Sequence, residues 1–265
     1  MNNRFKYKDL EAIRVGKFSN RVNTTCLIFR INNTVIDTGP PNQWKKVKEF
    51  LDEKKIESLL ITHYHEDHSG NGFEIKKEYG TKIFTNELSY KYCQEGFIVE
   101  FYRRVVWGKP KNFQAEILGE KIETENGLLF LPIKTPGHSE DMTCYLEKNR
   151  GWLFTGDLYI SSKMTHARIE NNAFEEMNSI KKILDYDFET VFCSHRGLLE
   201  DGKKTLEKKW NYLNNTYEKV IELKKKGYSL DETFKKIMGK EDLFSFMTMF
   251  YFTKKQFIKS FWDNI

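Results

Sequence analysis

The stretch Ile61-Thr62-His63-Tyr64-His65-Glu66-Asp67-His68-Ser69-Gly70 holds three of the chain's six histidines and an aspartate within six residues. It includes the end of the apolar run 59–61, which is typical of a buried strand. Neutral imidazoles and carboxylates are good ligands for a divalent ion such as zinc. Because so many of them share one short loop, the sequence predicts a metal site here.

The spacing of these side chains predicts two points of convergence. In an extended chain that leaves a strand, residues two apart point to the same side, so His63 and His65 can face one ion while Tyr64 points away. Asp67 and His68 come where the following Ser-Gly-Asn-Gly turns the chain, so they can face a second point nearby. The segment is not the helical H-E-x-x-H zinc motif, because His68 follows His65 by three residues instead of four. Two ions are therefore expected.

The run H-Y-H-E-D-H resembles the H-x-H-x-D-H signature of the metallo-β-lactamase superfamily. That family needs three further ligands downstream, and this chain has a candidate for each, at the end of an apolar run. They are His138 in T-P-G-H-S, Asp157 in F-T-G-D and His195 in F-C-S-H. The segment Ile36-Asp37-Thr38-Gly39 is similar to the turn that these proteins carry after an early strand. The resemblance covers residues 24–200.

The resemblance implies a ligand assignment by position. Three histidines would hold the first ion, an aspartate and two histidines the second, and one aspartate would bridge both: His63, His65 and His138; Asp67, His68 and His195; and Asp157. The expected cofactors are two divalent metal ions, zinc from the ligand types, with iron or manganese as alternatives. Asp67 is the catalytic candidate, expected to orient the attacking water and to receive its proton.

Other residues near these ligands have alternative interpretations. Asp37 either builds a turn or supports a ligand from behind. Arg196 stands where His-Gly is usual, and it either binds an anionic group beside the second ion or is a solvated surface residue. Ser69-Gly70-Asn71 replaces the Gly-Gly pair often found after the signature. His166 is expected to be an ordinary histidine and not a ligand.

Composition indicates a folded protein that acts inside the cell. The 265 residues, 39% of them apolar, are enough to bury a core. The four cysteines are scattered without a C-x-x-C pair, which indicates reduced thiols. The amino-terminal residues lack the apolar stretch of a signal peptide, and no run approaches the length of a membrane span. A cytoplasmic location without membrane association is expected.

The order of the expected elements indicates a layered α/β fold. Strands are expected over 11–15, 24–31, 34–36, 58–62, 82–84, 117–122, 128–134, 143–146, 152–155 and 189–193. Helices are expected over 43–55, 73–79, 172–184, 200–226, 230–238 and 246–262. Ligands at strand ends in two strand-rich halves point to two sheets packed face to face, and the resemblance implies the four-layer αββα sandwich. This domain is expected over 1–200, with a helical C-terminal extension over 201–265 packed on it or on a partner.

Two aromatic segments have no assigned role at this stage. Residues 86–113 are unusually aromatic, and they form either core or a lid beside the metals. The helix expected over 246–262 is apolar nearly all round, so it must dock on its own domain or on a second subunit, as in a homodimer.

The resemblance leaves three functions open. The first is a hydrolase that uses a dinuclear-metal-bound hydroxide on a small ester, thioester or lactone, as in glyoxalase II. The second is a metal-dependent endoribonuclease or phosphodiesterase, as among the lactamase-β-like members. The third is a non-heme iron redox protein on the same scaffold, which ranks last because the flavodiiron set has an acidic residue where His65 stands.

Charge bears on the choice between the first two functions. The net charge is +5, and residues 201–265 hold 14 basic against 9 acidic side chains, whereas residues 1–200 hold 29 of each. The basic tail either attracts nucleic acid or carries its lysines on solvated helix faces. Because the first 200 residues are charge-balanced and the segment nearest the site is aromatic, a small-molecule substrate is favoured over nucleic acid.

Overall fold

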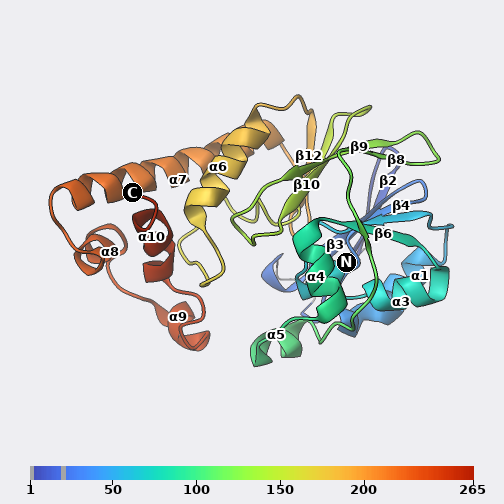
Figure 1. The fold of residues 1–265 in the computed structure, drawn as a ribbon, viewed down its shortest axis with the longest axis horizontal. Helices are drawn as coiled ribbons and strands as arrows, with labels where there is room; N and C mark the ends of the chain where they lie inside the picture. Colours follow the sequence, from blue (N-terminus) through green and yellow to red (C-terminus); the bar gives the residue numbers. More distant parts are fainter. Residues whose placement is uncertain (1–2, 19–21) are drawn as a thin grey trace. The chain divides into compact units, whose positions relative to one another are not determined.

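The computed structural model describes residues 3–18 and 22–265 (Figure 1). The chain forms two compact units, each built from several stretches of sequence. The first unit comprises Met1–Ile133, Thr143–Asp157 and Phe188–Leu199. The second comprises Lys134–Met142, Leu158–Asp187 and Glu200–Ile265. The last stretch of the second unit begins at Glu200, where the sequence predicts a domain boundary. That this position separates two domains stays a prediction.

The first of two sheets is mixed and has seven strands, which lie in sequence order from β1 to β7. β1 to β4 pair antiparallel, and β4 to β7 pair parallel. The strands are β1 (Arg4–Tyr7), β2 (Leu10–Val15), β3 (Cys26–Ile31), β4 (Thr34–Ile36), β5 (Ser58–Leu60), β6 (Lys82–Thr85) and β7 (Glu116–Ile117). The predicted Asn-Asn hairpin turn joins β3 to β4, with Asn32 at φ 51°.

The second sheet has six strands in the order β13-β12-β11-β10-β9-β8. β11 and β12 pair parallel, whereas β10–β11 and β12–β13 pair antiparallel. The strands are β8 (Ile122–Glu123), β9 (Leu129–Lys134), β10 (Thr143–Glu147), β11 (Trp152–Phe154), β12 (Thr190–Cys193) and β13 (Gly197–Leu199). The single strand predicted over 117–122 is wrong, because β7 ends on the first sheet and β8 begins on the second.

The two sheets of the first unit pack face to face over an aromatic core. Phe29 of the first sheet contacts Phe154 of the second with ring centroids 5.5 Å apart, and Phe154 stacks on Phe192 at 5.1 Å. All three side chains are buried. Burial of each such ring contributes about 1.5–3 kcal/mol, so this layer fixes the two sheets relative to each other.

Helices cover the outer face of the first sheet. α1 (Trp44–Leu51) and α3 (Gly72–Tyr79) lie side by side there (Figure 1) and bury Val47, Phe50 and Ile75 in a second core layer. α1 follows a 3₁₀ turn (Pro41–Gln43) and ends earlier than predicted. The aromatic segment 86–113 forms two helices that the sequence did not predict, α4 (Glu87–Glu95) and α5 (Phe101–Val106).

The second unit is helical, with α6 (Ala173–Leu184), α7 (Gly202–Lys225), α8 (Leu230–Met238), α9 (Leu243–Met247) and α10 (Lys254–Trp262). α6 lies alongside α7 (Figure 1). α7 buries the predicted apolar stripe at Leu206, Leu213 and Val220. Most of its lysines lie exposed on the other faces, as expected of a solvated helix surface.

The single helix predicted over 246–262 is wrong. The backbone reverses at Met249 and Phe250, which both have positive φ (51° and 59°), and this separates α9 from α10. Thr253 then caps α10 by accepting a hydrogen bond from the Gln256 backbone. Phe257 and Phe261 are buried in the unit's own core, whereas α9 leaves several apolar side chains exposed. A homodimer through this region stays a prediction.

In residues 3–18 and 22–265, no helix combines the length and apolarity needed to cross a membrane.

Candidate metal centre

The histidine loop is delivered by β5 and closed by the short helix α2 (Glu66–Ser69). β5 is buried and ends at Leu60, and the next residue, Ile61, still donates its backbone N–H to Phe84. α2 begins directly after His65. The Ser69 hydroxyl donates to the carbonyl of Tyr64 at 2.6 Å, which closes the turn. The loop is therefore braced at both ends.

The predicted pair of histidines two residues apart does converge. His63 Nε2 and His65 Nδ1 lie 2.9 Å apart, and both side chains are buried. Tyr64 points elsewhere and stacks on Tyr92 of α4 with ring centroids 4.1 Å apart. The alternation predicted from an extended chain is thus present, and it brings the aromatic segment 86–113 against the loop.

Four further predicted side chains meet in the first unit. His195 Nε2 lies 3.5 Å from Asp67 Oδ2 and 3.2 Å from Asp157 Oδ1. His68 Nε2 lies 3.6 Å and 3.4 Å from the same two carboxylates. Two groups of potential ligand atoms result, each with its members within 4.8 Å of one another: His63, His68 and Asp157; and Asp67, His68 and His195.

His138 lies in the second unit, on the loop Lys134–Met142 between β9 and β10. Its side chain is half-buried, and its carbonyl accepts a hydrogen bond from the side-chain amide of Asn171. Its place among the ligands stays a prediction from the sequence.

Asp37 combines the two roles between which the sequence left a choice. Its φ of 63° makes the turn after β4, a conformation that aspartate tolerates better than most residues. Its buried carboxylate accepts hydrogen bonds from Thr62, from the Ser194 hydroxyl at 3.1 Å and from His68 Nδ1 at 2.7 Å. Because the carboxylate only accepts, His68 must carry its proton on Nδ1 and present Nε2 to the cluster.

His195 is oriented in the same way by backbone carbonyls. Its Nδ1 lies 2.6 Å from the Thr25 oxygen and 3.0 Å from the Val22 oxygen. Since carbonyls accept, Nδ1 is the donor and Nε2 faces the carboxylates. The carbonyls of Thr25 and Val22 carried no sequence signal of their own, because each contacts His195 across a long stretch of chain.

The electrostatics of the cluster fit a bound cation. Burial opposes the charge on His195, but Asp157 and Asp67 outweigh it and raise the pKa of His195 to about 9. Burial likewise disfavours the charged form of His68, yet Asp157, Asp67 and Asp37 raise the pKa of this histidine well above its usual value. His68 Nε2 is buried with no hydrogen-bond partner among the described residues. The carboxylates therefore attract positive charge to a point where imidazole nitrogens already converge.

The remaining residues singled out by the sequence lie elsewhere. The side chain of Arg196 is exposed, and its role toward an anionic group stays a prediction. His166 lies in the second unit, with its Nε2 3.0 Å from Asp242 Oδ1, and it belongs to none of the potential ligand groups found in the described part of the chain.

A buried ion pair, which the sequence did not predict, ties α5 to the histidine loop. Arg103 donates to the carboxylate of Glu66, and both side chains are buried. Burial raises the pKa of Glu66, and the charge of Arg103 partly offsets this. The segment that bears α5 is thus attached to α2 at Glu66. In the sequence, Glu66 lies between the predicted ligands His65 and Asp67.

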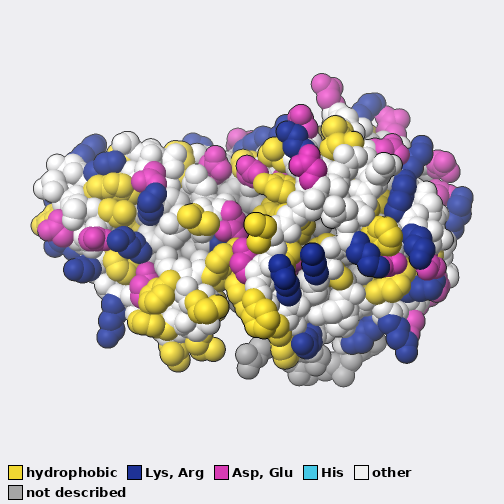
Figure 2. Space-filling view, turned by 60° about the horizontal axis from the view of Figure 1, so that its bottom comes forward, with side chains coloured by type: hydrophobic (Ala, Val, Ile, Leu, Met, Phe, Trp, Pro, Cys, Tyr) yellow, Lys and Arg dark blue, Asp and Glu magenta, His cyan; other side chains and the backbone are white. Residues whose placement is uncertain are grey.

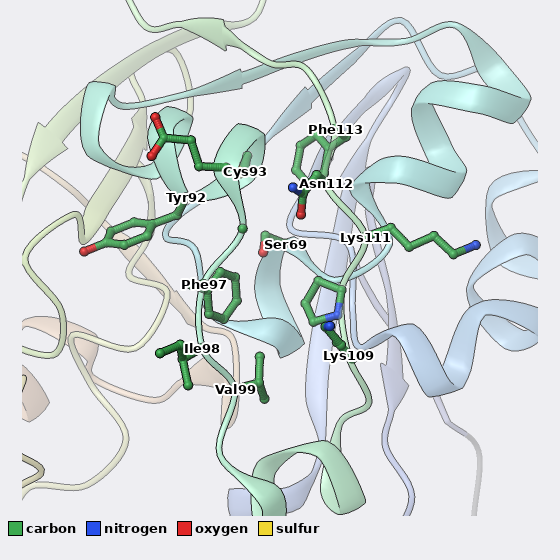
Figure 3. A pocket seen from close by; sticks show the side chains of 13 residues that line it. Ser69, Tyr92, Cys93, Phe97, Ile98, Val99, Lys109, Lys111, Asn112 and Phe113 are labelled. Atoms are coloured by element: carbon green, nitrogen blue, oxygen red, sulfur yellow. The ribbon is translucent and has the colours of Figure 1, made fainter.

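A cavity of about 400 Å³ opens beside this loop (Figure 3). Two stretches that flank α5, residues 92–99 and 109–113, form its walls together with Ser69. Phe97, Val99 and Phe113 contribute apolar surface and Asn112 contributes polar surface, whereas Lys111 points outward (Figure 3).

Comparison with known proteins agrees with this fold. The family model of the metallo-beta-lactamase superfamily matches residues 25–195, so the chain belongs to that superfamily. The structure of a metallo-beta-lactamase family protein from Thermus thermophilus, TTHA1429, covers 96% of this chain and 91% of its own, with a TM-score of 0.67 at 16% identity. The fold is therefore the α/β sandwich of this superfamily, as predicted.

Three curated relatives show which proteins this chain resembles in sequence. The beta-lactamase-like protein 2 homolog of Drosophila melanogaster is 28% identical over 76% of this chain and 67% of its own. A hydroxyacylglutathione hydrolase of Pelagibacter ubique is 28% identical over 62% of each chain. An atrochrysone carboxyl ACP thioesterase of Aspergillus fumigatus is 23% identical over 70% of this chain and 54% of its own. The class that fold and family model define is the metallo-β-lactamase superfamily, and relatives named as a hydrolase and a thioesterase are among the proteins that this chain resembles.

The chain spans between about half and two thirds of the length of the first curated relatives that it matches.

Proposed function

We propose that this protein is a metal-dependent hydrolase that acts on a small ester, thioester or lactone. The observation that carries the proposal is the convergence of His63, His68, Asp67, Asp157 and His195 at one edge of the sheets, with two imidazoles oriented from behind. Buried carboxylates and imidazole nitrogens within 4.8 Å of one another form a donor set that suits a divalent ion.

The ligands that we propose are the seven predicted from the sequence, with zinc as the metal and iron or manganese as alternatives. They are His63, His65, Asp67, His68, His138, Asp157 and His195. Divalent ions held by these residues would lower the pKa of a bound water and would polarise the carbonyl of a substrate.

Asp67 is the residue that we propose to act on that water. Its Oδ2 lies 3.5 Å from His195 Nε2 and 3.6 Å from His68 Nε2, so the carboxylate is placed among the nitrogens that would bind metal. Only 6% of the residue is exposed, which keeps bulk water away from the carboxylate. A carboxylate in this position can accept the proton that the attacking water loses.

The substrate class follows from the cavity beside the loop and from the relatives. A cavity of about 400 Å³, lined by both apolar and polar residues, is of a size that suits a small molecule. Two of the relatives are named as a hydroxyacylglutathione hydrolase and an ACP thioesterase, and both names describe the release of an acyl group.

The second candidate function is an endoribonuclease or phosphodiesterase. The excess of basic residues in 201–265 favours it, because nucleic-acid affinity depends on basic side chains. On the face shown in Figure 2, however, Lys and Arg side chains are interspersed with Asp and Glu and do not form one continuous basic track. We therefore rank the small-molecule substrate first.

A parallel assay distinguishes the two. Metal-loaded protein is tested on a panel of thioesters, carboxylic esters, lactones and single-stranded RNA. We expect turnover of one of the acyl substrates and negligible RNA cleavage at moderate salt. As a control, the exposed α7 residues Lys204, Lys208 and Lys219 are changed together to Gln, which should leave acyl turnover unchanged. RNA cleavage that dominates the panel and disappears in this triple variant would replace the proposal by the nuclease alternative.

A further inference from the structure

The second unit contains a buried lysine that the proposed function does not yet use. Lys209 of α7 is only 2% exposed, and so is its partner Glu176 of α6. The Lys209 ammonium donates to Glu176 Oε1 at 2.5 Å and to the backbone oxygen of Leu158 at 2.7 Å. Burying two opposite charges is costly and does not by itself stabilise a fold, so stability alone does not explain the pair.

Glu176 lies directly against the turn that carries His138. Gly137 has φ 139°, and a Cβ at this position would lie 2.4 Å from both Cα and Cβ of Glu176. The turn therefore approaches α6 as closely as only glycine permits. A change in the position of Glu176 would be transmitted to Gly137, because no space separates them.

Two hydrogen bonds fix the same turn to α6. The backbone N–H of Asn172 donates to the Gly137 oxygen at 2.8 Å, and the Ser179 hydroxyl donates to the Pro136 oxygen at 2.7 Å. Asn172 also caps α6 with its side chain. The residues just before His138 are thus held by the first two turns of one helix, and Lys209 holds that helix at Glu176.

The other contact of Lys209 reaches the chain next to Asp157. Leu158, whose oxygen accepts from the ammonium, is the residue that directly follows Asp157. The Lys209 ammonium therefore donates to Leu158, the neighbour of the proposed ligand Asp157. It also donates to Glu176 of α6, the helix that supports the turn before the proposed ligand His138. Residues behind ligands commonly set ligand orientation and metal affinity.

We propose that Lys209 is a positioning residue of the metal centre, which fixes the backbone that carries Asp157 and, through Glu176, the turn that carries His138. This inference rests on the proposed function, since it requires that these residues bind metal.

The test measures zinc affinity by competition with a chromophoric chelator, for the wild type and for Lys209→Met, which keeps an unbranched side chain as far as Cε and removes the ammonium. We expect an affinity about 10-fold or more weaker in the variant. Lys208→Met, on the exposed neighbouring residue of α7, is the matched control and should bind zinc like the wild type. The cobalt-loaded protein provides a second readout, because a displaced ligand changes its visible spectrum.

Hydrogen exchange of the metal-free proteins separates positioning from general instability. In Lys209→Met, peptides that cover residues 134–142 and 158–160 should exchange faster, while peptides from β3 and β12 should not. If Lys209→Met does not fold, the double variant Lys209→Met/Glu176→Gln removes both charges and keeps the comparison. Weaker zinc binding in that variant still supports the proposal, because the contact with Leu158 is lost.

The outcomes distinguish this inference from the proposed function. Wild-type protein that binds no zinc overturns the proposed function, and with it the role of Lys209. Wild-type protein that binds zinc, together with a folded Lys209 variant of equal affinity and an unchanged cobalt spectrum, overturns the inference alone.

Discussion

Asp37 orients His68 from the side of the ring that faces away from the other carboxylates of the candidate centre. Asp37 accepts from Nδ1 at 2.7 Å, while Nε2 faces Asp67 and Asp157. The convergence of the histidines was predictable from sequence, because the H-x-H-x-D-H motif lies within one short stretch of chain. The support from Asp37 was only one of two alternatives, since a contact across 31 residues leaves no periodic trace in the chain.

Replacing Asp37 tests that support. Asp37→Asn keeps a residue that tolerates positive φ but offers only one acceptor oxygen, so His68 loses its carboxylate partner. We expect zinc affinity to fall about 10- to 100-fold, with the fold retained. Titration with a chelator competitor measures it, and Asp52→Asn, at an exposed aspartate, is the control. Equal affinity in Asp37→Asn and wild type would show that the orientation of His68 does not depend on this bond.

Asp67 is tested by its effect on turnover. Asp67→Asn is nearly isosteric, so we expect a folded protein whose kcat is lowered by about 10²- to 10⁴-fold, because the proton acceptor is lost. KM should change much less than kcat. Steady-state kinetics on the best acyl substrate provide the measurement, with His166→Ala as a control that should retain activity. Loss of activity in the His166 variant, with activity kept in Asp67→Asn, would contradict the site assignment.

The titration of His195 predicts a pH dependence in the metal-free protein. Its pKa is raised to about 9 in the folded state, against 6.5 as its ordinary value. A group with a raised folded-state pKa stabilises the protein fully below pH 6.5, and this contribution is lost as the pH rises to about 9. Metal affinity should rise over the same interval, because protons leave the ligand.

Thermal unfolding with and without chelator between pH 6.5 and about 9 measures both effects. The metal-free protein should melt at lower temperature as the pH rises, and His195→Gln should flatten this slope. A melting temperature of the metal-free wild type that rises across the interval would contradict the prediction.

At the level of elements, the segment that bears α4 and α5 is attached to the histidine loop by one buried ion pair. Arg103 and Glu66 have side-chain exposures of 7% and 0%. The sequence showed this segment only as aromatic, and it predicted neither helix, because α4 and α5 are short and lack a clear apolar period. Long periodic elements such as α7 and α8 were predicted within about two residues.

Breaking this pair should destabilise the protein strongly. Arg103→Met leaves the carboxylate of Glu66 buried without its cation, which costs about 3–5 kcal/mol. Arg104→Met, at the exposed neighbour, should cost less than about 1 kcal/mol. Denaturant unfolding of the metal-free proteins gives both values, and Arg103→Met/Glu66→Gln should recover part of the loss. A cost for Arg103→Met as small as that of its neighbour would show that the pair does not anchor α5.

The error over 246–262 has a local cause. Apolar residues at helical spacing continue through this stretch, so the pattern alone favours one helix. The left-handed residues Met249 and Phe250 and the cap at Thr253 interrupt it instead. Such a reversal depends on what the flanking helices contact in the folded unit, and hydrophobic periodicity does not record that.

For the whole molecule, the superfamily and its α/β sandwich followed from a few residues, whereas the substrate did not. The ligand motifs lie at strand ends, where the topology of two stacked sheets collects them. The cavity beside Ser69 is built mainly by residues from 92–99 and 109–113, which carry no motif. The superfamily was therefore predictable from sequence, while the proposed choice among ester, thioester and lactone depends on a surface that only the folded chain forms.

We propose that this chain binds a pair of metal ions through its histidines and aspartates. Elemental analysis of protein purified without chelator tests it most directly. We predict about two transition-metal ions per chain, mainly zinc, and no more than about half of that content in the double variant His63→Ala/His68→Ala. Fewer than one ion per chain in protein reconstituted with excess zinc would contradict the account.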